Sequence, residues 1–493
     1  MALTKVTGEG LGLITGDIAT STAGINNFKA GASAGLGIVS GGNYNVTVGD
    51  GAGRFLTTGD KSTFVGFDAG KGITGTPITG SDNTAVGTNA GLRLQGVAAQ
   101  NTLIGSNAGD AITTGADNTA VGFQALTQTN TGHSNVAMGT NACNGNSTGL
   151  RNTGIGFQAL ANGLTANDNT GLGHNAGVNL NTGAENVAVG SKALQAANTG
   201  ANNVAIGFEA LTADTKGFSG VAVGAFALLS QNFTSNTDSH NVAVGINAGK
   251  FATTATDSTF IGANAGKGIT GAKLTGNVNT AVGSSAGLLL QGAANQNTMV
   301  GQLAGHNVTT GSGNVCIGIS AETSAVNSTN QIVIGESVTG VGNNNFTFGV
   351  GSSDSNIDFG QTSITAPSDQ RYKEDIETAT AGLSFIKDLR PVTFKWKKEK
   401  DLPTNHRAYV EGSETRTMND YTNHGFLAQE VKTVIDAHSE IKNGFSMWKT
   451  DEQADGGRQR LGDGALMPMM VKAMQELSTA LDAALARIAT LEG

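Results

Sequence analysis

The sequence predicts a mainly β fold, in which a parallel β-solenoid, or β-roll, of about 17-residue coils precedes an α+β domain ending in a helix. A short phrase closed by glycine recurs along most of the chain. The composition changes near Pro367: residues 1–367 hold only 12 of the 29 Lys and Arg residues, and both tryptophans, Trp396 and Trp448, lie in residues 368–493. A heptad pattern of apolar residues ends the sequence. These observations divide the chain into two domains of different kinds.

The repeated phrase consists of Asn, a small or β-branched residue, Ala or a similar residue, an aliphatic residue and Gly. Asn186-Val187-Ala188-Val189-Gly190 is one example. Most of the closing glycines are 17 residues apart, and a fixed period in this range is typical of solenoids. The alternation predicts a short strand with Val187 and Val189 on one face and Ala188 on the other. Gly190 then allows a turn with positive φ, or the close approach of another backbone.

A single coil of this length cannot bury an apolar face, so we expect each coil to complete its hydrogen bonds through its neighbours, about 4.8 Å away. The Asn that opens each phrase has two possible roles. It can form an amide ladder along the stack, or it can simply be a turn former. The sequence leaves both roles open.

Some steps between closing glycines are longer, and we interpret them as surface insertions. They are Lys71–Asp82, Leu92–Gln100, Leu229–His240, Lys267–Val278 and Leu288–Gln296. Loops on a rigid scaffold often carry binding sites, although we expect any one of these insertions to be solvated filler.

Residues 43–340, with their repeated Asn-x-Val-Ala-Ile-Gly phrase, resemble the left-handed β-roll of YadA-like trimeric adhesin heads. The period here is longer than that of the adhesin repeat. The resemblance implies a trimeric β-solenoid with small faces, such as the Ala positions, against the trimer axis. Association of three chains would supply apolar burial that one thin coil lacks.

Four motifs follow the composition break. They are Ser368-Asp-x-Arg-x-Lys373, Leu389-Arg390-Pro391-Val392 with Phe394 and Trp396, His424–Val431, and Met467–Leu477. Together, and in this order, they resemble the C-terminal intramolecular chaperone of endosialidases, phage tail fibres and tailspikes. The resemblance implies a domain that trimerises the protein, helps the preceding β-structure to fold and then cuts itself off.

The resemblance also implies that a Ser–Lys pair performs this cleavage, with Ser368 as the nucleophile and Lys373 as the general base. A serine hydroxyl is a weak nucleophile and needs an adjacent base. Lysine is a base only when it is neutral, which requires desolvation or nearby positive charge. Burial of Lys373 during trimer assembly would therefore time the cut, which we expect next to Ser368. One self-cleavage event per chain is the only enzyme activity that we assign.

Other candidate residues favour structural roles. His424 is expected to be a packed or hydrogen-bonded core histidine rather than a catalyst. Asp369 and Arg371 are expected to cap or pair locally. The segment Lys395–Lys400 is expected to be a solvated strand or sheet edge rather than a nucleic-acid patch.

The last motif runs into a helix after Pro468. Its apolar residues recur at alternating steps of four and three, as in a coiled-coil seam. They are Met470, Met474, Leu477, Leu481, Ala484, Ile488 and Leu491. Packing on a globular core is the alternative, but the length of the seam favours self-association.

The composition excludes several classes of protein. A net charge of −9 and a pI near 5.3 argue against a nucleic-acid partner. Cys143 and Cys316 are too far apart in the sequence to form a disulfide framework. No metal-ligand spacing and no phosphate-binding loop is present, so we expect no metal and no cofactor. No apolar run of about 18 residues exists, so no membrane insertion is expected.

The resemblance to the chaperone of tail fibres and tailspikes implies a phage tail fibre or tailspike, made in the host cytoplasm and carried on the virion. Residues 1–40 would attach to tail or baseplate proteins, and residues 41–350 would form a shaft that binds a host glycan or outer-membrane receptor. Residues 351–367 would be a linker, and residues 368–493 the releasable chaperone of a homotrimer. The opening MALTKVTGEGL is similar to the start of many tail-fibre proteins.

Two alternatives come from other classes. A glycan-degrading tailspike needs a pair of carboxylates about 5–10 Å apart, and the 18 acidic residues of residues 1–367 contain no recognisable pair. A bacterial trimeric surface adhesin needs a secretion signal and a membrane anchor, and neither is recognised in the sequence.

Overall fold

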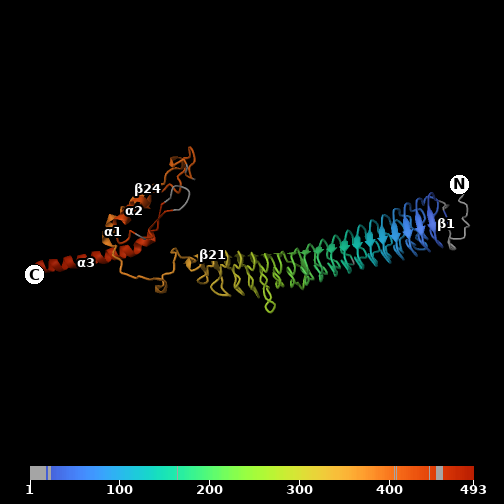
Figure 1. The fold of residues 1–493 in the computed structure, drawn as a ribbon, viewed down its shortest axis with the longest axis horizontal. Coiled ribbons are helices and arrows are strands. Elements are labelled where there is room, and N and C mark those ends of the chain that lie inside the picture. Colours follow the sequence, from blue (N-terminus) through green and yellow to red (C-terminus); the bar gives the residue numbers. More distant parts are fainter. Residues whose placement is uncertain are drawn as a thin grey trace, which may run out of the picture. The chain divides into compact units, whose positions relative to one another are not determined.

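A computed structural model describes residues 18–19, 24–163, 165–404, 406, 408–442, 445–450 and 459–492. The chain divides into two compact units, residues 1–367 and 368–493. Figure 1 shows stacked coils in the first unit and three helices in the second. The opening MALTKVTGEGL lies outside the described residues.

The first unit is a solenoid of about 19 coils. Its large sheet has 21 strands, and all neighbours pair in parallel except at the two ends, where β1 and β23 pair antiparallel. The strands of this unit are β1 (Ile18–Ala19), β2 (Phe28–Ala30), β3 (Val46–Val48), β4 (Thr63–Val65), β5 (Thr84–Val86), β6 (Thr102–Ile104), β7 (Thr119–Val121), β8 (Val136–Met138), β9 (Thr153–Ile155), β10 (Thr170–Leu172), β11 (Val187–Val189), β12 (Val204–Ile206), β13 (Gly217–Phe218), β14 (Val221–Val223), β15 (Thr237–Asp238), β16 (Val242–Val244), β17 (Thr259–Ile261), β18 (Thr280–Val282), β19 (Thr298–Val300), β20 (Val315–Ile317), β21 (Gln331–Glu336), β22 (Asn345–Val350) and β23 (Ser353–Asp358). The mainly β solenoid predicted from the repeat is confirmed.

The large sheet extends beyond the limits expected for the shaft. Its parallel part starts at β2, inside the expected attachment segment, and β23 lies inside the expected linker.

The closing glycine of each phrase is required by the approach of the next coil. Gly190 has a φ of 126°, and a Cβ atom there would lie 2.6 Å from the carbonyl oxygen of Gly207. Because Gly207 closes the next phrase, this contact repeats along the stack. Both roles expected for this glycine, positive φ and close backbone approach, are therefore present together.

The opening asparagines form the amide ladder. The Oδ1 atom of Asn186 accepts hydrogen bonds from the backbone N–H and the Nδ2 atom of Asn203, at 3.0 and 3.2 Å. The Nδ2 atom of Asn186 donates to Oδ1 of Asn169 and to the carbonyl oxygen of Gly200. Asn186 is fully buried, so these bonds satisfy an amide that would otherwise be costly to bury. Of the two roles left open by the sequence, the ladder is confirmed.

Some coils open with another residue in place of Asn: Ser62, Ser258 and Gln331 continue the ladder themselves, whereas one coil opens with Gly220. There the buried Asp214 and Gln231 complete the row, because Nε2 of Gln231 donates to Oδ2 of Asp214 over 2.6 Å. The Oε1 atom of Gln231 accepts from Nδ2 of Asn241 over 2.9 Å. A carboxylate and an amide from the turn region therefore replace the missing asparagine side chain.

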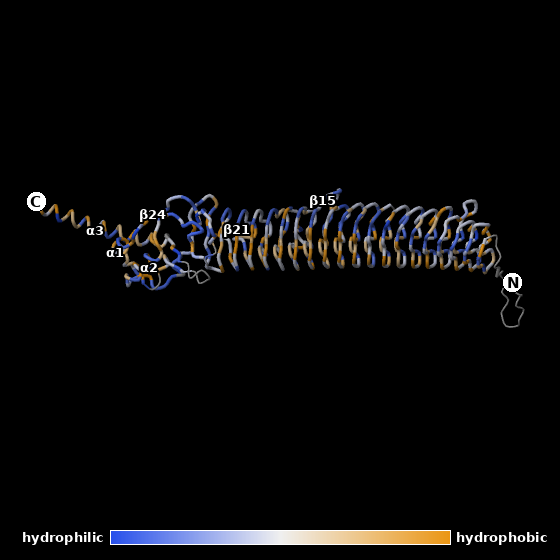
Figure 2. Tube along the Cα trace, turned by 90° about the horizontal axis from the view of Figure 1, so that it is seen from above, coloured by the Kyte–Doolittle hydropathy of each residue, from blue (hydrophilic) through white to orange (hydrophobic). Residues whose placement is uncertain are grey.

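The core lies inside each coil, and it corrects one expectation. The middle residue of each three-residue strand from β3 to β20 points inward, and Ala188, Ala205 and Ala222 are fully buried within the single chain. We expected the Ala positions to face a trimer axis, and this is wrong, because the interior of the coil already encloses them. The outward positions of the strands carry exposed aliphatic side chains, such as those of Ile104 and Ile206. Figure 2 shows hydrophobic positions recurring from coil to coil.

The longer coils are more than surface insertions. Ile78 and Leu274, which lie in two of the five insertions, are fully buried. Ile78 bridges to Leu56 in the preceding coil, and Leu274 bridges to Ala252. The tips of these insertions fold into small antiparallel bridges, but their return segments rejoin the core.

The second unit is an α+β arrangement. Its elements are η1 (Gln370–Tyr372), α1 (Leu383–Asp388), β24 (Val392–Phe394), η2 (Glu399–Asp401), β25 (Asn423–Gly425), α2 (Ala428–Ala437), β26 (Trp448–Thr450), β27 (Gln459–Leu461), η3 (Asp463–Ala465) and α3 (Leu466–Glu492). Its core contains Phe385 of α1, Val431 and Ile435 of α2, and Leu466 of α3. The helix α3 is also tied to α1, because Oε2 of Glu476 accepts a hydrogen bond from the backbone N–H of Leu383.

Candidate functional site

The two predicted catalytic side chains lie against each other at the start of the second unit. The Nζ atom of Lys373 donates a hydrogen bond to the Oγ atom of Ser368 over 2.7 Å. Both residues are exposed. Ser368 is the first residue of the second unit, and Pro367 is the last residue of the first.

A single turn of 3-10 helix brings this pair together. Asp369 is the N-cap of η1, and its Oδ1 atom accepts a hydrogen bond from the backbone N–H of Arg371 over 2.9 Å. The backbone N–H of Lys373 donates to the carbonyl oxygen of Gln370, which closes the turn. The chain therefore reverses between Ser368 and Lys373, and their side chains can meet.

Asp369 and Arg371 pair with each other, as expected. The Oδ2 atom of Asp369 accepts from Nε and Nη2 of Arg371, at 3.0 and 2.6 Å. This guanidinium lowers the pKa of Asp369 from its usual value. The Asp369 carboxylate therefore bonds to the Arg371 side chain and to the backbone N–H that it caps. The Ser368 hydroxyl bonds instead to the amine of Lys373.

This arrangement is suited to nucleophilic chemistry. A lysine amine at hydrogen-bond distance from a serine hydroxyl is the geometry that a Ser–Lys pair requires. The peptide bonds on either side of Ser368 are close to the hydroxyl because they belong to the same residue. An intramolecular attack thus needs no separate substrate-binding site.

Two of the other motifs meet through an ion pair. The Nε atom of Arg390 donates to Oε2 of Glu430 over 2.9 Å. Arg390 lies between α1 and β24, and Glu430 lies in the first turn of α2. This hydrogen bond lowers the pKa of Glu430. The ion pair therefore joins the two motifs within one unit.

His424 does not have the expected environment. It lies on β25 opposite Thr393 and is exposed, so the expectation of a core histidine is wrong. The core histidine of this unit is His438, which is only 9% exposed. Successive side chains of a strand point to opposite faces. The sequence does not indicate which face of β25 is buried.

Part of the basic segment 395–400 forms local ion pairs. Lys398 and Lys400 both form ion pairs with Glu414. The hydrogen bond from Lys398, together with that from Lys400, lowers the pKa of Glu414 to about 2. Lys398 also bridges to Arg416 as an antiparallel partner. The segment is thus a partly paired edge, in which two of the four lysines share one carboxylate.

The apolar seam of α3 is exposed in the single chain. Met474 is 68% exposed, and Leu477 and Leu481 are both 58% exposed. The helix itself was predicted after Pro468 and begins at Leu466. Several large apolar side chains on one exposed helix face indicate a surface for association.

The described residues offer no metal site and no membrane-spanning helix. They contain no group of three or more His, Cys, Asp or Glu side chains that could hold a metal ion. None of their helices combines the length and apolar character of a transmembrane span. Cys143 and Cys316 are buried free thiols, and burial raises the pKa of each to about 12, so neither is a reactive thiolate.

Comparison with known proteins finds a family match in the first part of the second unit. Residues 368–440 match the model of the family described as chaperone of endosialidase. The match begins at Ser368 and includes Lys373, the Arg390–Glu430 pair and all of α2. No curated protein and no solved structure matches the chain.

Proposed function

We propose that the protein is a homotrimeric phage tail fibre or tailspike whose second unit is an intramolecular chaperone that removes itself by cleavage next to Ser368. The observation that carries this proposal is the coincidence of three features at one residue. Ser368 starts the second compact unit, starts the match to the chaperone family and accepts a hydrogen bond from Lys373. Such a position suits a cut that separates a finished body from its folding aid.

Two exposed apolar surfaces support trimer formation. One is the seam of α3, and the other is the row of outward aliphatic residues on the solenoid strands. Each would be costly to leave in water. Three helices packed at the seam would hold three chains in register while their solenoids form.

The cleavage chemistry follows from the pair. Neutral Lys373 accepts the hydroxyl proton of Ser368 as Oγ attacks an adjoining peptide carbonyl. The C–N bond breaks, the amine leaves with a proton, and an ester forms. Water then hydrolyses the ester to a carboxylate and the free hydroxyl. In the single chain both side chains are exposed, and assembly that covers them would favour the neutral amine.

The test uses the full chain. The wild-type protein should give two fragments on a denaturing gel, with intact masses that correspond to a cut next to Ser368. Ser368→Ala and Lys373→Ala should each give one full-length band and still form trimers in light scattering. Ser363→Ala and Lys387→Ala, which alter exposed residues nearby, serve as matched controls and should be cut normally. Cleavage in the Ser368→Ala variant would reject the assignment.

In this proposal residues 1–40 attach the protein to the tail or baseplate, and residues 41–350 recognise a glycan or outer-membrane receptor on the host. The protein is made in the host cytoplasm and works on the virion. Its role would be tested by competition, because the purified protein should block adsorption of the phage to its host. A tailspike that degrades glycans would instead release reducing sugar from host polysaccharide.

A further inference from the structure

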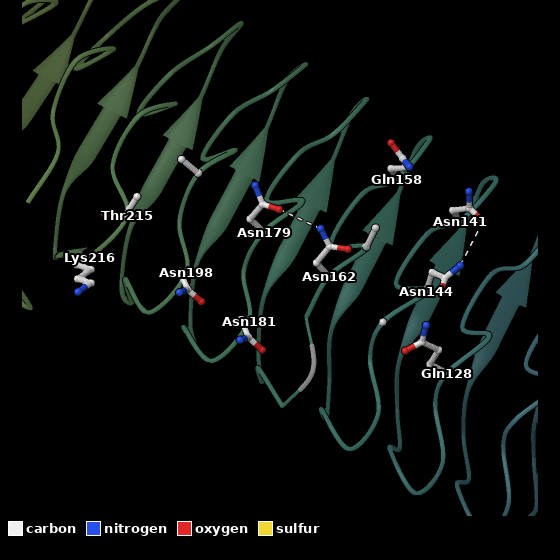
Figure 3. Close-up of a pocket in the computed structure, with 13 residues that line it drawn as sticks. Gln128, Asn141, Asn144, Gln158, Asn162, Asn179, Asn181, Asn198, Thr215 and Lys216 are labelled. Carbon is white, nitrogen blue, oxygen red and sulfur yellow. Dashed lines mark hydrogen bonds between the residues drawn. The ribbon is translucent and has the colours of Figure 1, made fainter. Parts of the chain in front are cut away.

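A polar groove runs along one side of the solenoid, across six successive coils. It extends from Gln128, after β7, to Lys216, after β12, and has a volume of about 860 Å³. Figure 3 shows amide side chains from adjacent coils along it. At about 4.8 Å per coil, the groove is roughly 24 Å long.

The groove follows from the lengths of the coils. Between Gly122 and Gly224 each closing glycine is 17 residues from the next, whereas the next coil, which ends at Gly245, is longer. The insertion in that longer coil contacts one end of the groove, because Nζ of Lys216 donates to the carbonyl oxygen of Thr234. Regular short coils beside a longer one leave a depression.

Small residues form the floor and amides form the sides. Gly145, Ala161 and Ala196 line the groove without filling it. Asn162 and Asn179 occupy the same position in adjacent coils, and Nδ2 of Asn162 donates to Oδ1 of Asn179 over 2.9 Å. Both are exposed. This bond leaves the second Nδ2 hydrogen of Asn162 and the whole NH₂ group of Asn179 directed to solvent.

The lining favours an uncharged ligand rich in hydroxyl groups. An amide can donate and accept at once, as a sugar hydroxyl can. Lys216 is the one charged residue in the lining, and no carboxylate or aromatic residue is among the residues that form it. The amide rows repeat at the coil spacing, which is close to the length of one pyranose unit. An extended chain of sugars can therefore meet equivalent amides along its length.

We propose that this amide groove, defined by Gln128, Asn144, Asn162, Asn179, Asn198 and Lys216, binds a neutral polysaccharide lying along the solenoid. The proposal rests on the proposed role in host recognition and names the ligand class and the place. The groove holds the sugar chain without cutting it, because a hydrolase requires a pair of carboxylates and the lining supplies none.

The test compares two amide pairs in the full-length protein. Asn162→Ala/Asn179→Ala removes the central pair of the groove. Asn247→Ala/Asn264→Ala removes a similar pair, joined by a 3.1 Å hydrogen bond between adjacent coils outside the groove. Binding is measured on an array of purified bacterial capsular polysaccharides and lipopolysaccharides, both neutral and acidic. Circular dichroism and melting temperature check that each variant is folded.

We expect the wild-type protein to bind at least one neutral polysaccharide, and the groove variant to bind it at least tenfold more weakly while the control variant is unchanged. Equal binding by both variants would place the site elsewhere and overturn this inference, but leave host recognition intact. Binding only to acidic polysaccharides, or binding to cells but to no polysaccharide, would also overturn it. Failure of the wild-type protein to bind any host cell would instead reject the proposed function.

Discussion

The ring of Phe260 occupies the space that a side chain on Gly266 would need. A Cβ atom on Gly266 would overlap this ring, and Gly266 has a φ of 55°. In the coil of Ala188, where the centre of the strand is small, the equivalent position is large: Leu194 is fully buried and has a φ of 51°. A large side chain thus fills this part of the interior from the strand in one coil and from the turn in the other.

Exchange of the large and small positions in one coil tests this packing rule. Phe260→Ala alone should lower the free energy of unfolding by about 3–5 kcal/mol, because it leaves a cavity. Gly266→Leu alone should destabilise by about 1–3 kcal/mol or more through overpacking. The double variant copies the Ala188–Leu194 arrangement, so it should lose less than the sum of the two. Urea unfolding of the three proteins gives the coupling, and simple additivity would contradict the rule.

Interruption of the asparagine ladder should have a local effect that can be located. Asn186→Ala removes the acceptor of the backbone N–H of Asn203 and the donor to the carbonyl oxygen of Gly200. Each buried group left unpaired costs about 1–3 kcal/mol. Asn186→Asp should be worse, since it buries a charge and turns an oxygen toward Gly200. Hydrogen exchange should accelerate at Asn203 first, and unchanged protection there would contradict the role of the ladder.

The repeated phrase made the solenoid and its short strands predictable, because a fixed period near 17 residues is typical of stacked coils. It left the asparagine ladder as one of two open roles. The inward face was not predictable, since alternation separates Ala188 from Val187 without saying which one is enclosed. The turn that places Leu194 inside was also hidden, because a leucine with positive φ is unusual. The pair Ser368 and Lys373 could be predicted from the sequence, but only because the two residues belong to a recognisable motif. The amide groove arises from coil lengths and belongs to no motif.

The polarity of the hydrogen bonds around Gln231 predicts a reciprocal rescue. Asp214 accepts from Nε2 of Gln231, and Oε1 of Gln231 accepts from Asn241. Asp214→Asn would turn an N–H group toward Nε2 of Gln231 or lose the bond to the backbone N–H of Gly217, so it should destabilise by about 1–3 kcal/mol. When Gln231→Glu is added to Asp214→Asn, one carboxylate oxygen of residue 231 can accept from the new amide at position 214. The other can still accept from Nδ2 of Asn241.

The double variant Asp214→Asn/Gln231→Glu should therefore recover most of the lost stability, as measured by the thermal midpoint of the full-length protein. Gln231→Glu alone should be destabilising, since two carboxylates would then face each other. If the double variant is as unstable as the sum of the single variants, the direction of the hydrogen-bond chain is wrong.

His438 lies between two carboxylates at the edge of the second core. Its Nε2 is 2.9 Å from Oδ2 of Asp388 at the end of α1, and its Nδ1 is 3.1 Å from Oε1 of Glu440. The ring packs edge-on against Phe385. The hydrogen bond to Asp388, followed by that to Glu440, raises the pKa of His438 above 6.5. The protonated imidazole is therefore favoured in the folded state.

This shift predicts the pH dependence of the second unit. Because the folded pKa is the higher one, the stabilisation is fully present below about pH 6.5 and is lost as the pH rises through the folded pKa. Both tryptophans lie in residues 368–493, so their fluorescence reports urea unfolding of this unit alone. The unfolding free energy should fall by on the order of 1 kcal/mol as the pH is raised to 9. His438→Gln should flatten this slope, whereas the exposed His424→Gln should leave it unchanged. A slope that persists in the His438→Gln variant would show that another group titrates.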